Sequence, residues 1–178
     1  MKYGLVICIA LSIACFASLG FKDKGKRMTT AELGELLFFD PILSEDHSVS
    51  CASCHKPEFA FADTVAFSTG VHGKKAARNT PSAMNVAARE ALFWDGRAAT
   101  LEEQALMPIE NPDEMNLPVS EAVIRLNNSK YRQLFIQVFG KVPDRKSLGI
   151  AISEYEKTLE TSDTPNDRWL NDEPGGLT

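Results

Sequence analysis

Residues 51–55 read Cys51-Ala52-Ser53-Cys54-His55, the pattern CxxCH. In an exported chain this pattern is typical of the covalent attachment site of a c-type haem. On one turn of helix, Cys51 and Cys54 share a face and can form thioethers with the two vinyl groups of the haem. His55 follows directly and can bind the iron from its proximal side. The motif therefore predicts one covalently attached haem c, held by a small helical domain.

Two other uses of these cysteines rank below haem. A redox-active disulfide is expected in a thioredoxin-like βαβ context, and the surrounding sequence shows no such alternation. A zinc site built from Cys51, Cys54 and His55, with His47 or His72 as the fourth ligand, has enough ligands. It lacks the paired ligand spacing that structural zinc sites normally have.

The N-terminal segment predicts export. Residues 5–20 contain no charged side chain and follow a start with the single positive charge of Lys2. This run is short for a membrane span, which needs about 20 apolar residues, and fits a secretory signal. We expect residues 1–20 to be a signal peptide or lipoprotein leader and the Lys-rich residues 21–30 to be a tether. Cys8 leaves with the leader, whereas Cys15 is either discarded or becomes a lipid anchor. The expected location is the periplasm.

Length and charge set further limits. A chain of 178 residues with 44% hydrophobic residues has the size of one domain. Its formal net charge of -5 argues against general nucleic-acid binding, which needs a basic surface. Four cysteines are too few for a disulfide scaffold, and two of them lie in the leader.

The mature chain predicts an all-α, cytochrome c-like haem domain with long loops over residues 31–172. Thr29 or Thr30 is expected to cap a helix that runs through Phe38 and ends at Pro41. Its inward positions would be Leu33, Leu36 and Leu37, with Phe38 as a further candidate.

Four further helices are expected from caps and apolar spacing. Thr100-Leu101-Glu102-Glu103 is a capping box that opens a helix toward Met107, with Pro108 as its stop. The other three are capped by Ser120, Ser129 and Asp144, with Gly140 ending the second. The last one carries a single apolar stripe: Leu148, Ile152, Tyr155 and Leu159. Between Phe59 and Pro81 no period is visible, and a loop of that length in a compact domain usually has a function or wraps a cofactor.

Several further blocks resemble one family. The blocks are, in order, residues 33–41 (LGELLFFDP), 78–82 (RNTPS), 93–97 (FWDGR), Gln104, 108–115 (PIENPDEM), 155–159 (YEKTL) and 167–170 (DRWL). With the CxxCH motif, they resemble the bacterial dihaem cytochrome c peroxidase family, which includes the methylamine-utilisation enzymes that oxidise tryptophan. The resemblance runs from about Glu32 to Leu170 and covers the peroxidatic, N-terminal haem domain.

That resemblance implies roles for individual residues. His55 would be the proximal iron ligand, and Glu114 would be the distal acid-base group with Gln104 beside it. Trp94 would relay electrons between two haems, although a buried tryptophan in the core is the alternative. The substrate would be hydrogen peroxide, with electrons from a small donor protein, either cytochrome c or a cupredoxin.

Other polar residues have weaker assignments. His72, between Gly70 and Gly73, occupies the loop where some family members carry a distal histidine that caps the iron and swings away. An exposed loop histidine is the alternative. Asn79 resembles a calcium ligand of a site whose other ligands lie in a second domain. Arg78 and Arg97 are candidates for neutralising haem propionates or for solvated surface residues, and His47 is expected at the surface.

The family also has a second haem domain with its own CxxCH, which is absent from this chain. Residues 173–178 would be the start of the linker to it, and we expect a truncated reading frame rather than a halved enzyme. Two functional classes are therefore weighed: a peroxidase, and a monohaem electron-transfer cytochrome. An electron carrier needs a fixed Met or His as sixth ligand, whereas a peroxidase needs an open or openable iron. Met84, Met107 and Met115 are available, although filling apolar space is the favoured interpretation of each. Tryptophan oxidation on a partner protein is a third alternative.

Overall fold

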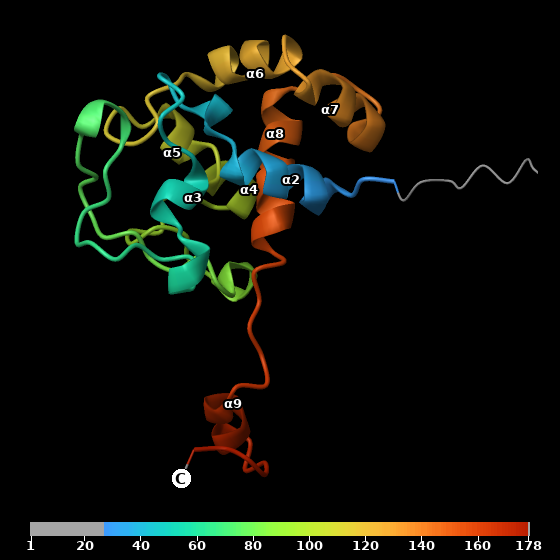
Figure 1. Ribbon diagram of the computed structural model, residues 1–178. Helices are drawn as coiled ribbons and strands as arrows, with labels where there is room; N and C mark the ends of the chain where they lie inside the picture. The colour runs from blue at the N-terminus through green and yellow to red at the C-terminus, as the bar shows by residue number, and fades with distance from the viewer. Residues whose placement is uncertain (1–26, 178) are drawn as a thin grey trace, which may run out of the picture.

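The computed structural model describes residues 27–177, and the regular elements in that range are helices joined by loops (Figure 1). Extended pairing there is limited to isolated bridges, such as Lys56 with Ala62. The predicted all-α class with long loops is therefore confirmed. The expected leader, with Cys8 and Cys15, lies outside the described residues. Within residues 27–177, no helix has both the length and the apolar character that a membrane span requires.

Two crossing helices form the centre of the fold, α2 (Thr30–Phe39) and α8 (Arg145–Glu156). Each begins with a capping box, made by Thr29 with Glu32 on α2 and by Asp144 with Ser147 on α8. The side-chain oxygen of the cap accepts a hydrogen bond from a first-turn amide that has no partner within the helix. The predicted starts of both helices are confirmed.

The helices approach each other closely at Gly34. A Cβ atom on this residue would lie 1.8 Å from the carbonyl oxygen of Ala151, so only glycine fits at the crossing. The buried face of α2 is therefore formed by Leu33, Gly34, Leu37 and Phe38. Leu36 was expected inward but is 41% exposed, because it lies on the opposite side of the helix from this contact.

The predicted helix from Thr100 to Pro108 is wrong in its extent. The structure has two short helices instead, α4 (Leu101–Gln104) and α5 (Met107–Glu110). Pro108 lies in the first turn of α5, where its missing N–H needs no partner, so it starts a helix rather than stopping one. The capping box is also incomplete, because the Glu103 carboxylate accepts from the amide of Ala99.

Helices α6 (Val119–Asn127) and α7 (Tyr131–Phe139) cover one end of the central pair (Figure 1). Helix α6 begins one residue before the predicted cap, Ser120, which lies in its first turn. Ser129 does supply a hydroxyl acceptor to the amide of Tyr131, and Gly140 ends α7 with φ of 70° as expected.

The opposite side is formed by α3 (Cys51–Cys54) and by the long loops around it. Residues 60–81 contain a single helical element, a short 3₁₀ turn (Val71–Gly73), as the absence of a period predicted. A further helix that the sequence analysis did not predict, α9 (Pro165–Leu170), lies apart from the other helices in Figure 1.

Candidate haem-binding site

The CxxCH motif lies on α3, a single helical turn. The amide of Ser50 donates to the hydroxyl of Ser53 at 3.0 Å, and the amide of His55 donates to the carbonyl of Cys51 at 2.9 Å. The turn therefore carries both thiols, with His55 directly at its end. Neither Cys51 nor Cys54 is in a disulfide.

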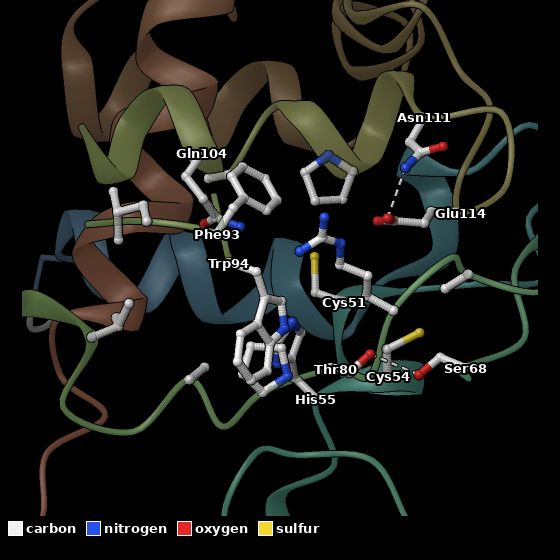
Figure 2. A pocket seen from close by; sticks show the side chains of 18 of the residues that line it. Cys51, Cys54, His55, Ser68, Thr80, Phe93, Trp94, Gln104, Asn111 and Glu114 are labelled. Carbon is white, nitrogen blue, oxygen red and sulfur yellow. Dashed lines mark hydrogen bonds between the residues drawn. The ribbon is translucent and has the colours of Figure 1, made fainter. Parts of the chain in front are cut away.

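Both thiols and the imidazole line one cavity of about 510 Å³ (Figure 2). That volume lies within the range of roughly 300–1,000 Å³ that is typical of cofactor pockets. The walls come from α3, from the loop of residues 76–83, from the segment of residues 86–97, and from α4, α5 and α8. The loop between Phe59 and Pro81 thus contributes Ser68 and residues 76–81 to the wall of a cofactor-sized cavity.

The imidazole of His55 is held in one tautomer. Its Nδ1 lies 3.0 Å from the carbonyl oxygen of Phe61, which can only accept, so Nδ1 carries the proton. Nε2 is then the unprotonated nitrogen with a lone pair available to a metal. Burial lowers the pKa of His55, which keeps the ring neutral as metal binding requires.

The two thiols do not have the character of a redox pair. Burial, followed by the nearby charge of Glu156, raises the pKa of Cys51 to about 12. Burial also raises the pKa of Cys54. Thiol–disulfide exchange proceeds through the thiolate, so these values disfavour the redox-disulfide alternative. Within residues 27–177, no group of three or more His, Cys, Asp or Glu side chains is placed to hold a metal ion.

Glu114 lines the same cavity and is half-buried. Burial raises the pKa of its carboxyl group. The side-chain amide of Asn111 donates to Glu114 Oε1 at 2.8 Å, and Figure 2 marks this hydrogen bond with a dashed line. This bond fixes the orientation of the carboxylate. Asn111 had no role in the sequence analysis, and its position three residues before Glu114 in the same block is the only signal that pointed to it.

Gln104 and Trp94 also line the cavity. Gln104 is the last residue of α4, whereas Trp94 lies on the loop before it. Trp94 is 66% exposed, so the alternative of a core tryptophan is wrong. Its indole Nε1 donates to the carbonyl of Asn79 at 3.5 Å. The structure thus brings the three residues expected to be catalytic, Gln104, Trp94 and Glu114, to the cavity that holds the CxxCH motif.

The cavity carries cationic side chains at its exposed margin. Arg78, Arg89 and Arg97 line it and are exposed. The guanidinium of Arg97 lies 3.6 Å from the centre of the Phe93 ring and 2.8 Å from Asp95 Oδ1. These positions suit the neutralisation of carboxylates on a cofactor.

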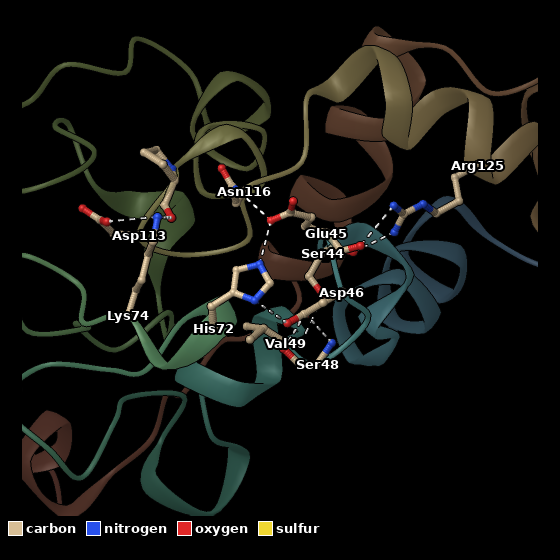
Figure 3. Close-up of polar contacts among 11 residues, drawn as sticks. Ser44, Glu45, Asp46, Ser48, Val49, His72, Lys74, Asp113, Asn116 and Arg125 are labelled. Carbon is tan, nitrogen blue, oxygen red and sulfur yellow. Dashed lines mark hydrogen bonds and ion pairs between the residues drawn. The ribbon is translucent and has the colours of Figure 1, made fainter.

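His72 is not among the residues that line this cavity. Its ring points toward Glu45 and Asp46 (Figure 3), with Nε2 at 3.0 Å from Glu45 Oε2 and Nδ1 at 3.7 Å from Asp46 Oδ2. The amide of Asn116 donates to the same Glu45 oxygen. The backbone of His72 has φ of 56°, in the left-handed region. The conformation described here therefore keeps His72 away from the cavity, and its role as distal ligand stays a prediction.

Two other residues from the sequence analysis lie at the surface. Asn79 is exposed, and its side-chain amide donates to the carbonyl of Val65 at 3.1 Å. Its calcium role stays a prediction. His47 is exposed as expected, with Nε2 at 3.2 Å from the guanidinium of Arg125.

The donor set of the cavity fits a c-type haem. It offers two thiols on one helical turn, one oriented and neutral imidazole, and cationic groups at its margin. One further observation concerns Glu156, which is buried and lines the cavity. Its Oε2 has no hydrogen-bond partner among the described residues. A buried carboxyl oxygen of this kind is costly unless a bound group interacts with it.

The model of the di-haem cytochrome c peroxidase family matches residues 28–175. The chain belongs to this family. The predicted resemblance is confirmed, and haem c is the cofactor that membership implies.

Named relatives agree with this membership in the di-haem cytochrome c peroxidase family. The chain is 39% identical over 150 residues to a cytochrome c551 peroxidase of Pseudomonas aeruginosa, covering 82% of this chain and 43% of that protein. It is 39% identical over 142 residues to a methylamine utilization protein MauG of Methylophilus methylotrophus, covering 79% and 42%. The solved diheme peroxidase BthA of Burkholderia thailandensis superposes with a TM-score of 0.73 and 31% identity, covering 84% and 43%. The chain therefore spans less than half of each of these relatives.

Proposed function

We propose that this chain is the peroxide-reducing haem domain of a periplasmic cytochrome c peroxidase. It would hold one haem c and reduce hydrogen peroxide to water with electrons from a small redox protein, a cytochrome c or a cupredoxin. The observation that carries the proposal is that the CxxCH motif and the oriented carboxyl of Glu114 line one cofactor-sized cavity.

Three residues would hold the haem. Cys51 and Cys54 would form the thioethers, and Nε2 of His55 would bind the iron, because Nδ1 is already hydrogen-bonded to Phe61. The hydrogen bond from Nδ1 keeps the ring from rotating and makes Nε2 a stronger donor. The haem supplies an iron centre at which peroxide binds and to which electrons are delivered.

Glu114 would carry out the proton transfers. Reduction of one peroxide to two water molecules consumes two electrons and two protons, and cleavage of the O–O bond needs a proton on the leaving oxygen. The carboxylate of Glu114 can accept the proton of one peroxide oxygen and return it to the other. Burial raises the pKa of Glu114, which makes it a better base than an exposed carboxylate. Asn111 keeps one carboxylate oxygen in place, and Gln104 adds an uncharged polar group to the cavity wall.

The proposal is tested by producing the chain with a c-type haem maturation system and measuring its mass. An added mass of one haem, lost in a Cys51→Ala/Cys54→Ala variant, is expected. The reduced, haem-loaded chain should then change its visible spectrum when peroxide is added, and it should consume peroxide with a chemical reductant. A chain without covalent haem, or a loaded and reduced chain that is inert to peroxide, would refute the proposal.

One observation favours an electron-transfer cytochrome as the second candidate. Met115 is buried and lines the cavity, next to Glu114 in the sequence, so a thioether is available as a fixed sixth ligand. The test is the methionine-to-iron charge-transfer band in the visible spectrum. This candidate requires the band to be present in wild type and in Met107→Leu and to disappear in Met115→Leu. Tryptophan oxidation on a partner protein remains the third candidate, supported by the relatives named methylamine utilization protein MauG.

Two finer assignments belong to the same proposal. A calcium ion at Asn79 is supported only by the resemblance of residues 78–82 and is tested by metal analysis of wild type and Asn79→Ala. A lipid anchor at Cys15 is tested by labelling cells with a radioactive fatty acid and comparing wild type with Cys15→Ser.

A further inference from the structure

Glu156 is a buried carboxyl group for which the proposed mechanism has no use. It is the last residue of α8, is 8% exposed, and lines the cavity with Cys51 and Ile152. Its Oε2 has no hydrogen-bond partner among residues 27–177. Burial alone raises the pKa of Glu156 to about 8, so near neutral pH the group is close to the point where it gains or loses a proton.

The charged groups on the helices packed against α8 are paired elsewhere or exposed, and none of the following lines the cavity. On α4, Glu102 pairs with Lys157 at 3.0 Å. On α2, Glu35 is exposed and acts on Tyr155 rather than on Glu156. On α6, Arg125 is directed at the carbonyls of residues 42–45.

The remaining ionisable neighbours line the cavity itself: Cys51, Cys54, His55, Arg78, Arg89, Arg97, Asp113 and Glu114. Of these, the cysteines lose their ionisable thiols when thioethers form. The pKa of His55 is set by its own burial, by backbone hydrogen bonds and by Asp63, with no contribution from Glu156. The charges of Glu156 and, to a smaller extent, Glu114 both raise the pKa of the Cys51 thiol.

A charge change at the centre of this cavity must act on a carboxyl buried in its wall. Ferric and ferrous iron differ by one positive charge, and screening is weak where water is excluded. Resting on the proposed haem attachment, we propose that Glu156 binds one proton when the haem iron accepts one electron and releases it when the iron is oxidised. The electron comes from the donor protein or an electrode, and the proton comes from solvent through the exposed margin of the cavity.

The sign of this coupling can be stated in advance. The ferrous centre has less positive charge, so the carboxyl holds its proton more tightly in the reduced protein. Between the two resulting pKa values, the reduction potential falls as pH rises, by at most about 59 mV for each tenfold drop in proton concentration. Below and above that pH window, proton binding by Glu156 does not change the reduction potential with pH.

The test is a redox titration of the haem-loaded chain from pH 5 to 10, monitored by its visible spectrum. We expect a sloping region around neutral to mildly alkaline pH in wild type. In Glu156→Gln the slope should be lost in that window, and the potential at alkaline pH should be higher than in wild type because no negative charge develops. Glu154→Gln is the matched control, since Glu154 lies on the same helix but pairs with Lys157 at 2.8 Å outside the cavity. It should retain the wild-type slope.

A redox-difference infrared spectrum gives a second readout. The band of a protonated carboxyl should appear on reduction in wild type and be absent in Glu156→Gln, while Glu114→Gln should keep it. If Glu156→Gln does not load haem, Glu156→Asp should keep a slope with a shifted window.

The outcomes distinguish a failure of the proposed role of Glu156 from a failure of the proposed function. A wild-type potential independent of pH, or a slope unchanged in Glu156→Gln, overturns the role of Glu156 while leaving the haem domain intact. A chain that carries no covalent haem refutes the proposed function itself.

Discussion

Replacing Glu114 with glutamine is the most direct test of the distal chemistry. Glutamine has nearly the same shape, and its Oε1 can still accept the 2.8 Å hydrogen bond from Asn111. The substitution therefore removes the base and little else. General acid–base catalysis contributes about 10²–10⁴-fold to rates. At about 1.36 kcal/mol for each factor of ten, the expected increase in activation free energy is roughly 2.7–5.4 kcal/mol.

The assay is stopped-flow mixing of the reduced, haem-loaded chain with peroxide at several pH values. Burial raises the pKa of Glu114 above its ordinary value of 4.5, and the base works only when ionised. The wild-type rate should therefore fall as pH is lowered through that raised pKa. The acid limb should be missing in Glu114→Gln.

The control for this substitution is Glu121→Gln, which changes an exposed carboxyl on α6 outside the cavity. It should react like wild type. If Glu114→Gln bound haem normally and reacted with peroxide within about threefold of the wild-type rate, far less than base removal should cost, Glu114 would not be the base.

Three further substitutions test the framework of the site. Asp144→Ala removes the cap of α8 and should lower the free energy of unfolding by about 0.5–2 kcal/mol, whereas Asp144→Asn should retain most of it, as measured by urea denaturation. Gly34→Ala places a methyl group against the carbonyl of Ala151. The free energy of unfolding should therefore fall by about 1–3 kcal/mol, or the chain should fail to fold. Alanine at an exposed position of α2 is the control and should have no such effect. Glu45→Ala removes the acceptor that holds His72 outside the cavity. If His72 is a distal ligand, the visible spectrum of the haem-loaded variant should show a larger six-coordinate fraction than wild type. A spectrum identical to that of wild type would argue against this ligand role.

The sequence supported conclusions that depend on neighbours in the chain. The CxxCH turn needs only one helical turn to bring Cys51, Cys54 and His55 together, so its spacing was sufficient. The starts of α2 and α8 were predicted for the same reason, because Thr29 and Asp144 cap amides within three residues. Family membership also follows from blocks of consecutive residues.

Predictions that depended on distant contacts were less successful. Leu36 is apolar and fits the spacing of α2, but the close approach of α8 at Gly34 determines which face is buried. Pro108 could end one helix or begin another, and in the structure it lies in the first turn of α5, whose Ile109 is buried. Apolar spacing and caps do not contain that information.

The sequence by itself was sufficient to predict haem c as the cofactor, the helical class and the family. These depend on local motifs and on capping signals between residues close together in the chain. Only the tertiary structure decided how the polar groups that line the cavity are buried, oriented and paired. It placed Glu114 with Asn111 and buried Glu156 in the cavity wall, while it left Trp94 exposed and held His72 against Glu45 outside the cavity. The physical reason is that burial and charge environment arise from elements far apart in sequence, which meet only when α2, α3, α5 and α8 have packed together.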